Sequence, residues 1–384
     1  MSFLIGVRLD NPAIIQSADG NITIDGTGGT GTGDLALGVV LLGGTPVQIS
    51  GSGAVDITGT GGSGSIAHYG ILLQTAGITT SGGGISMTGT GGTSVTDGTM
   101  AGAVFLAGAN VSDSGAGNIT LSGFGGTGTG GDRGIIFNNA PGSSVTTNNG
   151  DISITGTGGA GTGNANDGAF LSAGASISST GTGSISLMGT GANTDQNNRG
   201  VYILNASTVS SAGGGVDITG LGGGTGANNN NIGIDIVGSS IVEDTSSGNV
   251  ILDGTGGLGT NLNPGVQVNS GAVRSFDGDV MMTGTGGNGS TFDNDGIRML
   301  GSAIVENSGA GSIFLNGNAG TGTDANQGIR MEQDGTRITT INGGITMNGF
   351  GGNATGNNNE GITIINGAVV EATGTGSILS LIHI

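Results

Sequence analysis

The chain repeats a pattern in which two aliphatic residues flank one small polar residue and a glycine–threonine segment follows. One clear copy is residues 150–159 (GDISITGTGG), where Ile152 and Ile154 alternate with serine and threonine. Alternation with a period of two predicts a β-strand with one buried face. The glycines that follow predict the end of the strand, because glycine turns the backbone at low steric cost.

This pattern recurs at a nearly constant interval. We call the first aliphatic residue of each copy the anchor. From residue 22 to residue 378 there are eleven intervals, and their mean is about 32 residues. A period of this length indicates a solenoid, a propeller or an array of repeats. The anchors are Ile22, Val55, Ile85, Ile119, Ile152, Ile185, Val216, Val250, Val280, Ile313, Ile345 and Ile378.

Each repeat contains two further strand-like pieces. The second piece begins at a glycine, as in residues 70–73 (GILL), and the third is shorter, as in residues 47–49 (VQI). A propeller blade would need four antiparallel strands joined by tight hairpins, and no two-residue hairpin signals separate these pieces. We therefore predict an all-β fold, a single-stranded parallel β-helix (β-solenoid) with three strands per coil of about 32 residues and about 11–12 coils.

In such a fold each strand pairs with its copy one coil further on, about 4.8 Å away, so equivalent residues form interior columns. One predicted column is Ile22, Val55, Ile85, Ile119 and Ile152, and the next is Ile24, Ile57, Met87, Leu121 and Ile154. A third is Val39, Ile71, Ile135, Val201, Ile234, Val266, Ile297 and Ile329.

Composition narrows the class of protein further. Glycine supplies 91 of 384 residues, but with 4 prolines and no glycine at every third position the chain is not collagen. The net charge is −19, and the cations are seven arginines, which argues against nucleic acid or an anionic membrane as a partner. There is no cysteine, which excludes a disulfide framework and thiol chemistry.

No shift in composition divides the chain, so we predict one continuous solenoid over residues 1–378. Residues 379–384 (LSLIHI) reverse the expected order of polar and aliphatic positions. They resemble a translated sequencing adapter, and we interpret them as a non-native tail. Both ends of the solenoid lack caps, which predicts self-association through open strand edges.

The repeats resemble those of a known group of proteins. Residues 20–29 (GNITIDGTGG) and 134–137 (GIIF) are similar to the β-strand repeats of filamentous-haemagglutinin-like and autotransporter-passenger surface proteins of bacteria. The resemblance covers the chain up to Ile378. It implies a right-handed parallel β-helix, a secreted or outer-membrane-associated cell-surface location, and a role as a stalk or adhesin.

Catalytic residues are hard to find in this sequence. His68 is the one histidine outside the suspected tail, and a single histidine makes no triad or metal cluster, so we interpret it as a surface-loop residue. Arg298 and Arg330 are expected to stack one coil apart on a solvated face, with no carboxylate between them. We assign no catalytic residue and predict that the chain is not an enzyme.

One loop offers ligands for a cation. Residues 293–296 (DNDG) supply two carboxylates, Asp293 and Asp295, and carboxylate oxygens are ligands that calcium prefers. The alternative, a solvated acidic loop, is favoured because the ligand set is incomplete. We therefore predict no cofactor, with calcium at Asp293 and Asp295 as the alternative.

The sequence thus favours a structural stalk or adhesin-like segment of a secreted or surface-displayed bacterial protein. Its partners would be glycans or proteins on host or neighbouring cells. Two alternatives stay open: a β-helical polysaccharide-degrading enzyme, and a calcium-stabilised binding module. The ligand, the secretion route and the full-length architecture do not follow from the residues.

Overall fold

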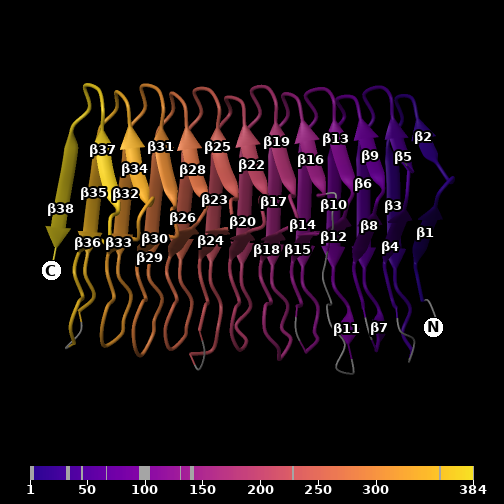
Figure 1. Cartoon of the computed structure of the whole chain (residues 1–384). Helices are drawn as coiled ribbons and strands as arrows, with labels where there is room; N and C mark the ends of the chain where they lie inside the picture. The colour runs from indigo at the N-terminus through magenta and orange to yellow at the C-terminus, as the bar shows by residue number, and fades with distance from the viewer. Residues whose placement is uncertain are drawn as a thin grey trace. The chain divides into compact units, whose positions relative to one another are not determined.

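The structure is a computed structural model. It describes residues 4–31, 35–44, 46–65, 67–94, 104–129, 131–138, 142–226, 229–353 and 356–383. The contacts between residues divide the chain into two units, Met1–Thr194 and Asp195–Ile384, and each is described by itself. In both units three strands per coil build three parallel sheets, which confirms the predicted all-β solenoid with about 32 residues per coil (Figure 1).

In the described part of the first unit, each sheet has six strands in coil order. The first sheet holds β1 (Val7–Asp10), β4 (Val39–Leu42), β8 (Ile71–Gln74), β12 (Val104–Ala107), β15 (Ile135–Asn138) and β18 (Ala169–Leu171). The second holds β2 (Ile15–Ser17), β5 (Val47–Ile49), β9 (Gly77–Thr80), β13 (Asn110–Asp113), β16 (Ser144–Thr147) and β19 (Ser176–Ser179). The third holds β3 (Ile22–Thr27), β6 (Val55–Thr60), β10 (Ile85–Thr90), β14 (Ile119–Phe124), β17 (Ile152–Thr157) and β20 (Ile185–Thr190). The short strands β7 (Ser63–Gly64) and β11 (Thr93–Ser94) pair in the long loops.

The described part of the second unit repeats this arrangement. Its first sheet holds β21 (Val201–Ile203), β24 (Ile234–Val237), β27 (Val266–Asn269), β30 (Ile297–Leu300), β33 (Ile329–Glu332) and β36 (Ile362–Ile365). Its second holds β22 (Thr208–Ser211), β25 (Ile241–Asp244), β28 (Ala272–Ser275), β31 (Ile304–Asn307), β34 (Arg337–Thr340) and β37 (Val369–Ala372). Its third holds β23 (Val216–Leu221), β26 (Val250–Thr255), β29 (Val280–Thr285), β32 (Ile313–Asn318), β35 (Ile345–Phe350) and β38 (Ile378–His383).

The interior columns follow the predicted register. In the first unit Ile22 pairs with Val55 and Ile24 with Ile57, and the register continues without slippage to β17. In the second unit the column from Val201 to Ile329 is in register throughout. Nearly all of these side chains are fully buried. Since a slip of one residue would exchange the buried and exposed faces, the aliphatic alternation specifies this register.

The glycine near the end of the third-sheet strands from β3 to β35 has a steric cause. Gly26 and Gly59 occupy this position in successive coils. A Cβ atom on Gly59 would lie 2.2 Å from the carbonyl oxygen of Gly70, at the start of the next first-sheet strand. Glycine at this position therefore lets the third sheet approach the first, and it recurs from β3 to β35. In β38 the position is Ile382, which pairs with Gly349.

The first sheet is covered on both faces. Val40 and Ile136 point away from the solenoid interior, yet each is only 1% exposed, and they pack in a cluster with Leu37 and Tyr69 from the long loops. The loops that precede β4 and β8 thus form an outer layer over this part of the sheet. Continuous apolar runs such as Val39–Leu42 are typical of strands buried on both faces.

The segment interpreted as a non-native tail continues the last strand. Ile378 pairs with Ile345, and the next residue, Leu379, is 51% exposed opposite Thr346. The polar Ser380 pairs with the inward-facing Met347, so the reversal of polar and aliphatic positions seen in the sequence is present in the strand. Ile384 lies outside the described residues.

Candidate functional site

A row of buried asparagines lies in the loops just before the first-sheet strands. Each of these residues lies two positions before the glycine that precedes a first-sheet strand, and we call the row the asparagine ladder. Its members in the second unit are Asn198, Asn231, Asn263, Asn294, Asn326 and Asn359. All but Asn359 are fully buried. The ladder is therefore an internal polar column that runs beside the aliphatic ones.

The ladder joins successive coils through side-chain amides. The backbone N–H of Asn294 donates to Oδ1 of Asn326 at 3.2 Å, and its Nδ2 donates to the same oxygen at 3.0 Å. Asn326 repeats both bonds to Oδ1 of Asn359, each at 3.1 Å. Asn263 donates through Nδ2 to Oδ1 of Asn294 at 2.8 Å. Buried polar groups that are bonded in this way add coil-to-coil specificity that aliphatic contacts lack.

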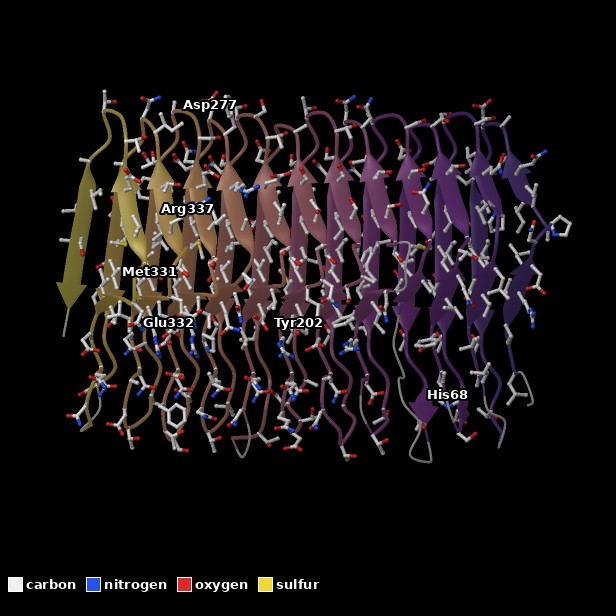
Figure 2. The ribbon with its side chains drawn as sticks, viewed as in Figure 1. His68, Tyr202, Asp277, Met331, Glu332 and Arg337 are labelled. Atoms are coloured by element: carbon white, nitrogen blue, oxygen red, sulfur yellow. The ribbon has the colours of Figure 1, made fainter. Side chains whose placement is uncertain are left out.

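His68 occupies the equivalent position in the first unit, two residues before Gly70. It has no exposed surface, so the interpretation of His68 as a surface-loop residue is wrong. Figure 2 shows the position of His68 in the region of the long loops. Burial lowers the pKa of its imidazole, against the opposing effect of the nearby Gly64 and Ala36 backbone groups. An imidazole with no exposed surface cannot reach an external substrate as a base.

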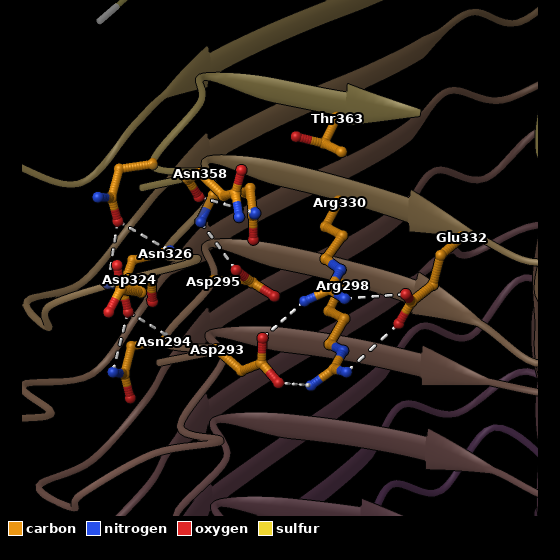
Figure 3. Close-up of polar contacts among 12 residues, drawn as sticks. Asp293, Asn294, Asp295, Arg298, Asp324, Asn326, Arg330, Glu332, Asn358 and Thr363 are labelled. Carbon is orange, nitrogen blue, oxygen red and sulfur yellow. Dashed lines mark hydrogen bonds and ion pairs between the residues drawn. The ribbon is translucent and has the colours of Figure 1, made fainter. Parts of the chain in front are cut away.

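A cluster of charged side chains lies over the first sheet of the second unit. We call Asp293, Arg298, Arg330 and Glu332 the arginine–carboxylate cluster. Asp293 accepts from Nη1 of Arg298 at 3.3 Å and from Nη1 of Arg330 at 2.6 Å. Glu332 accepts from Nη2 of the same two arginines at 3.3 and 2.9 Å. The four side chains thus form a closed ring of ion pairs across two successive coils (Figure 3).

The cluster corrects the expectation for its two arginines. They do stack in register one coil apart. However, both arginine side chains are largely buried, so the prediction that they lie on a solvated face is wrong. The prediction that no carboxylate lies between them is also wrong, because Asp293 and Glu332 each bind both arginines. The covering loop explains the error, because it places Asp293 over the outward face of the strands. A ring that satisfies its own charges is suited to joining coils.

Asp295 lies beside this ring and is fully buried. Its Oδ1 accepts from the backbone N–H of Gln327 at 2.8 Å, while its Oδ2 makes no bond with the described residues. Burial raises the pKa of this carboxyl group to about 7, against the opposing effect of Arg298 and Arg330. Near neutral pH the group therefore carries a proton in a large share of molecules.

The two residues considered for calcium have separate environments. Both carboxylate oxygens of Asp293 bind arginine, and Asp295 points its Oδ1 at a backbone amide. Among the described residues, no group of three or more histidine, cysteine, aspartate or glutamate side chains is arranged to hold a metal ion. The intervening Asn294 belongs to the asparagine ladder.

Two further arginines are held by the same outer layer. Arg133 bonds Asp167 at 2.8 Å, and its guanidinium lies 3.9 Å from the centre of the Phe170 ring. In the second unit Arg199 bonds Asp235 at 2.8 Å and lies 4.0 Å above the ring of Tyr202. Each arginine thus forms an ion pair with the next coil and also packs over an aromatic ring.

The asparagine ladder was not predicted from the sequence, although the sequence contains a signal for it. The tripeptide Asn-x-Gly recurs immediately before the first-sheet strands, for example at residues 231–233 and 263–265. Its period equals that of the anchors, which indicates stacking of the asparagines. The arginine–carboxylate cluster has no comparable signal, because Asp293 comes from an irregular loop.

Comparison with other proteins gives no further assignment. No protein-family model, no curated protein and no solved structure matches the chain. A membrane-crossing helix is not found in the part of the chain that the structure describes. The fold is that of a β-helical repeat protein, and it fits a structural or adhesin-like role.

Proposed function

We propose that the chain is a structural stalk or adhesin-like segment of a secreted or surface-displayed bacterial protein, and that it is not an enzyme. The observation that carries the proposal is the arginine–carboxylate cluster. Its two arginines and two carboxylates are at most 17% exposed and bind one another across successive coils. These charged groups bind one another between coils and thereby stabilise the solenoid. The polar side chains on the outward faces of the strands are then free to contact partners.

The outward rows support the same role. On the third sheet of the first unit, Thr23, Asp56, Ser86 and Thr120 stack in register on successive strands. Thr27, Thr60 and Thr90 form a second row at the strand ends, and all three are exposed. Repeated polar rows of this kind offer a long hydrogen-bonding surface to a glycan or a protein on another cell.

The alternative of a polysaccharide-degrading enzyme has one favourable observation. The cluster brings aspartate, glutamate and arginine together from two coils, and the adjacent Asp295 has the raised pKa of a general acid. Against it, Asp295 has no exposed surface. A general acid must reach the leaving-group oxygen of its substrate, and we therefore favour the structural role.

An adherence assay with a parallel cleavage assay tests the proposal. Beads coated with the purified chain should be retained on cultured epithelial cells or on cells of a second bacterium, whereas beads coated with albumin should not. The soluble chain should release no new reducing ends from cellulose, starch, pectin or chitin. Release of reducing ends that Asp295→Asn abolishes would establish the enzyme and refute the structural role.

A further inference from the structure

A groove of about 590 Å³ crosses the outer side of the first unit, where β3, β6, β10 and β14 begin. Its floor is the outward row Thr23, Asp56, Ser86 and Thr120. The first, second and fourth of these side chains are exposed, and Ser86 is half-buried. The groove therefore runs across the strands, along the direction in which the coils stack.

The residue that precedes each of these strands explains the opening. This position is Asn21, Ala54, Gly84 and Asn118 in the four coils, and all four residues line the groove. Two small residues lie between two asparagines, so the wall lacks side chains over two successive coils. The neighbouring Gly82 is also open, since a Cβ placed on it would meet no atom within 4 Å. From Asn21 to Asn118 is three strand spacings, or about 14 Å.

The two asparagines present hydrogen-bond donors at the ends of the groove. Oδ1 of Asn21 accepts from the N–H of Ala54 at 2.9 Å, and Oδ1 of Asn118 accepts from the N–H of Asp151 at 2.8 Å. Neither Nδ2 makes a hydrogen bond with another described residue. The bonds to Oδ1 therefore fix the orientation of the two side-chain amides, and their Nδ2–H groups can donate hydrogen bonds to a ligand.

The lining defines the chemistry of the ligand. Its polar groups are three hydroxyls, two amides, glycine peptide groups and a single carboxylate, Asp56, and it contains no arginine, lysine or histidine. The rest of the lining is apolar and consists of Ala54, Val55, Ile85 and Ala116. Such a surface bonds hydroxyl groups and disfavours anions, because nothing in the lining balances the negative charge of Asp56. From the groove and its lining we infer that it binds a short, neutral oligosaccharide along the stacking direction. The inference rests on the proposed adhesin role and assigns a ligand class to it.

The test uses the whole chain and defined probes. Binding of cellotetraose, maltotetraose, chitotetraose and tetragalacturonate is measured by saturation-transfer NMR and calorimetry. Ser86→Trp fills the floor of the groove. Ser153→Trp is the matched control, since Ser153 is the next residue of the same outward row, on β17 beyond the groove. Asp56→Ala is a second variant, which removes the exposed carboxylate of the lining.

We expect at least one neutral tetrasaccharide to bind, with affinity about tenfold lower for Ser86→Trp and unchanged for Ser153→Trp. Asp56→Ala should weaken the same sugar by about three- to tenfold. Absence of binding by every neutral probe, equal binding of tetragalacturonate, or equal loss in both tryptophan variants would each overturn the inference. Adherence of coated beads without oligosaccharide binding would refute the groove alone, whereas oligosaccharide binding without adherence would refute the adhesin role alone.

Discussion

Replacement of Asp295 by asparagine should stabilise the protein at neutral and alkaline pH. The carboxyl group is fully buried, and its pKa is raised from 3.8 to about 7 by burial. Because the folded state holds the proton more tightly than the unfolded chain, the contribution to stability is complete below pH about 3.8. It is lost progressively as the pH rises to about 7.

The magnitude follows from the two pKa values. A difference of about three corresponds to about 4 kcal/mol of stability lost between acidic and alkaline pH. Asparagine does not ionise, and its oxygen can still accept from the N–H of Gln327. We therefore expect Asp295→Asn to gain about 1–3 kcal/mol at pH 8 and to change little at pH 4.

Urea denaturation followed by circular dichroism at pH 4, 6 and 8 measures this effect. Asp25→Asn is the control, since it makes the same chemical change at an exposed carboxylate on β3, where no buried group is replaced. Destabilisation by Asp295→Asn at pH 8 would refute the reasoning. It would mean that the carboxylate is ionised and held by Arg298 and Arg330.

Three further predictions concern the ladder, the cluster and calcium. Asn294→Ala should lower the free energy of unfolding, measured in urea, by about 2–4 kcal/mol, because it removes buried hydrogen bonds between coils. The control Asn353→Ala, at an exposed asparagine, should lower it by under about 0.5 kcal/mol. Equal effects of the two substitutions would contradict a stabilising role of the ladder. Glu332→Gln should lower the free energy of unfolding by about 1–3 kcal/mol, because it breaks the buried ring of ion pairs. Glu306→Gln breaks a more exposed ion pair, so it should lower the free energy of unfolding by under about 1 kcal/mol, and high salt should abolish this effect. Chelation with EDTA should leave the melting temperature unchanged, because both oxygens of Asp293 bind arginine, and a clear decrease that calcium restores would support the calcium module.

The interior of the solenoid could be predicted because one physical rule governs it. Aliphatic residues at positions such as Ile119 and Leu121 alternate with exposed polar ones, and repetition at a constant period places equivalent residues in one column. The third column was predicted incompletely, because it also contains Val104, which pairs with Ile71 and Ile135, and Ala169, which pairs with Ile135. Val104 was missed because no glycine precedes it, and the glycine served as the marker of the second piece.

The outer layer could not be predicted in the same way. Periodicity distinguishes the inner from the outer face of a strand, but it does not show that a loop covers the outer face. That covering buries Ile136 and encloses His68 and Arg298, which alternation alone would leave exposed. The position of Asp293 in the cluster depends on the path of an irregular loop, for which the chain offers no repeat to compare, whereas Glu332 is the last residue of β33.

Labelling of intact cells tests the proposed role most directly. An antibody raised against the purified chain is applied to living cells that produce the protein, before and after they are permeabilised. The stalk or adhesin role predicts strong labelling of intact cells, which external protease removes. Labelling that appears only after permeabilisation, with no protein in the medium, would contradict it.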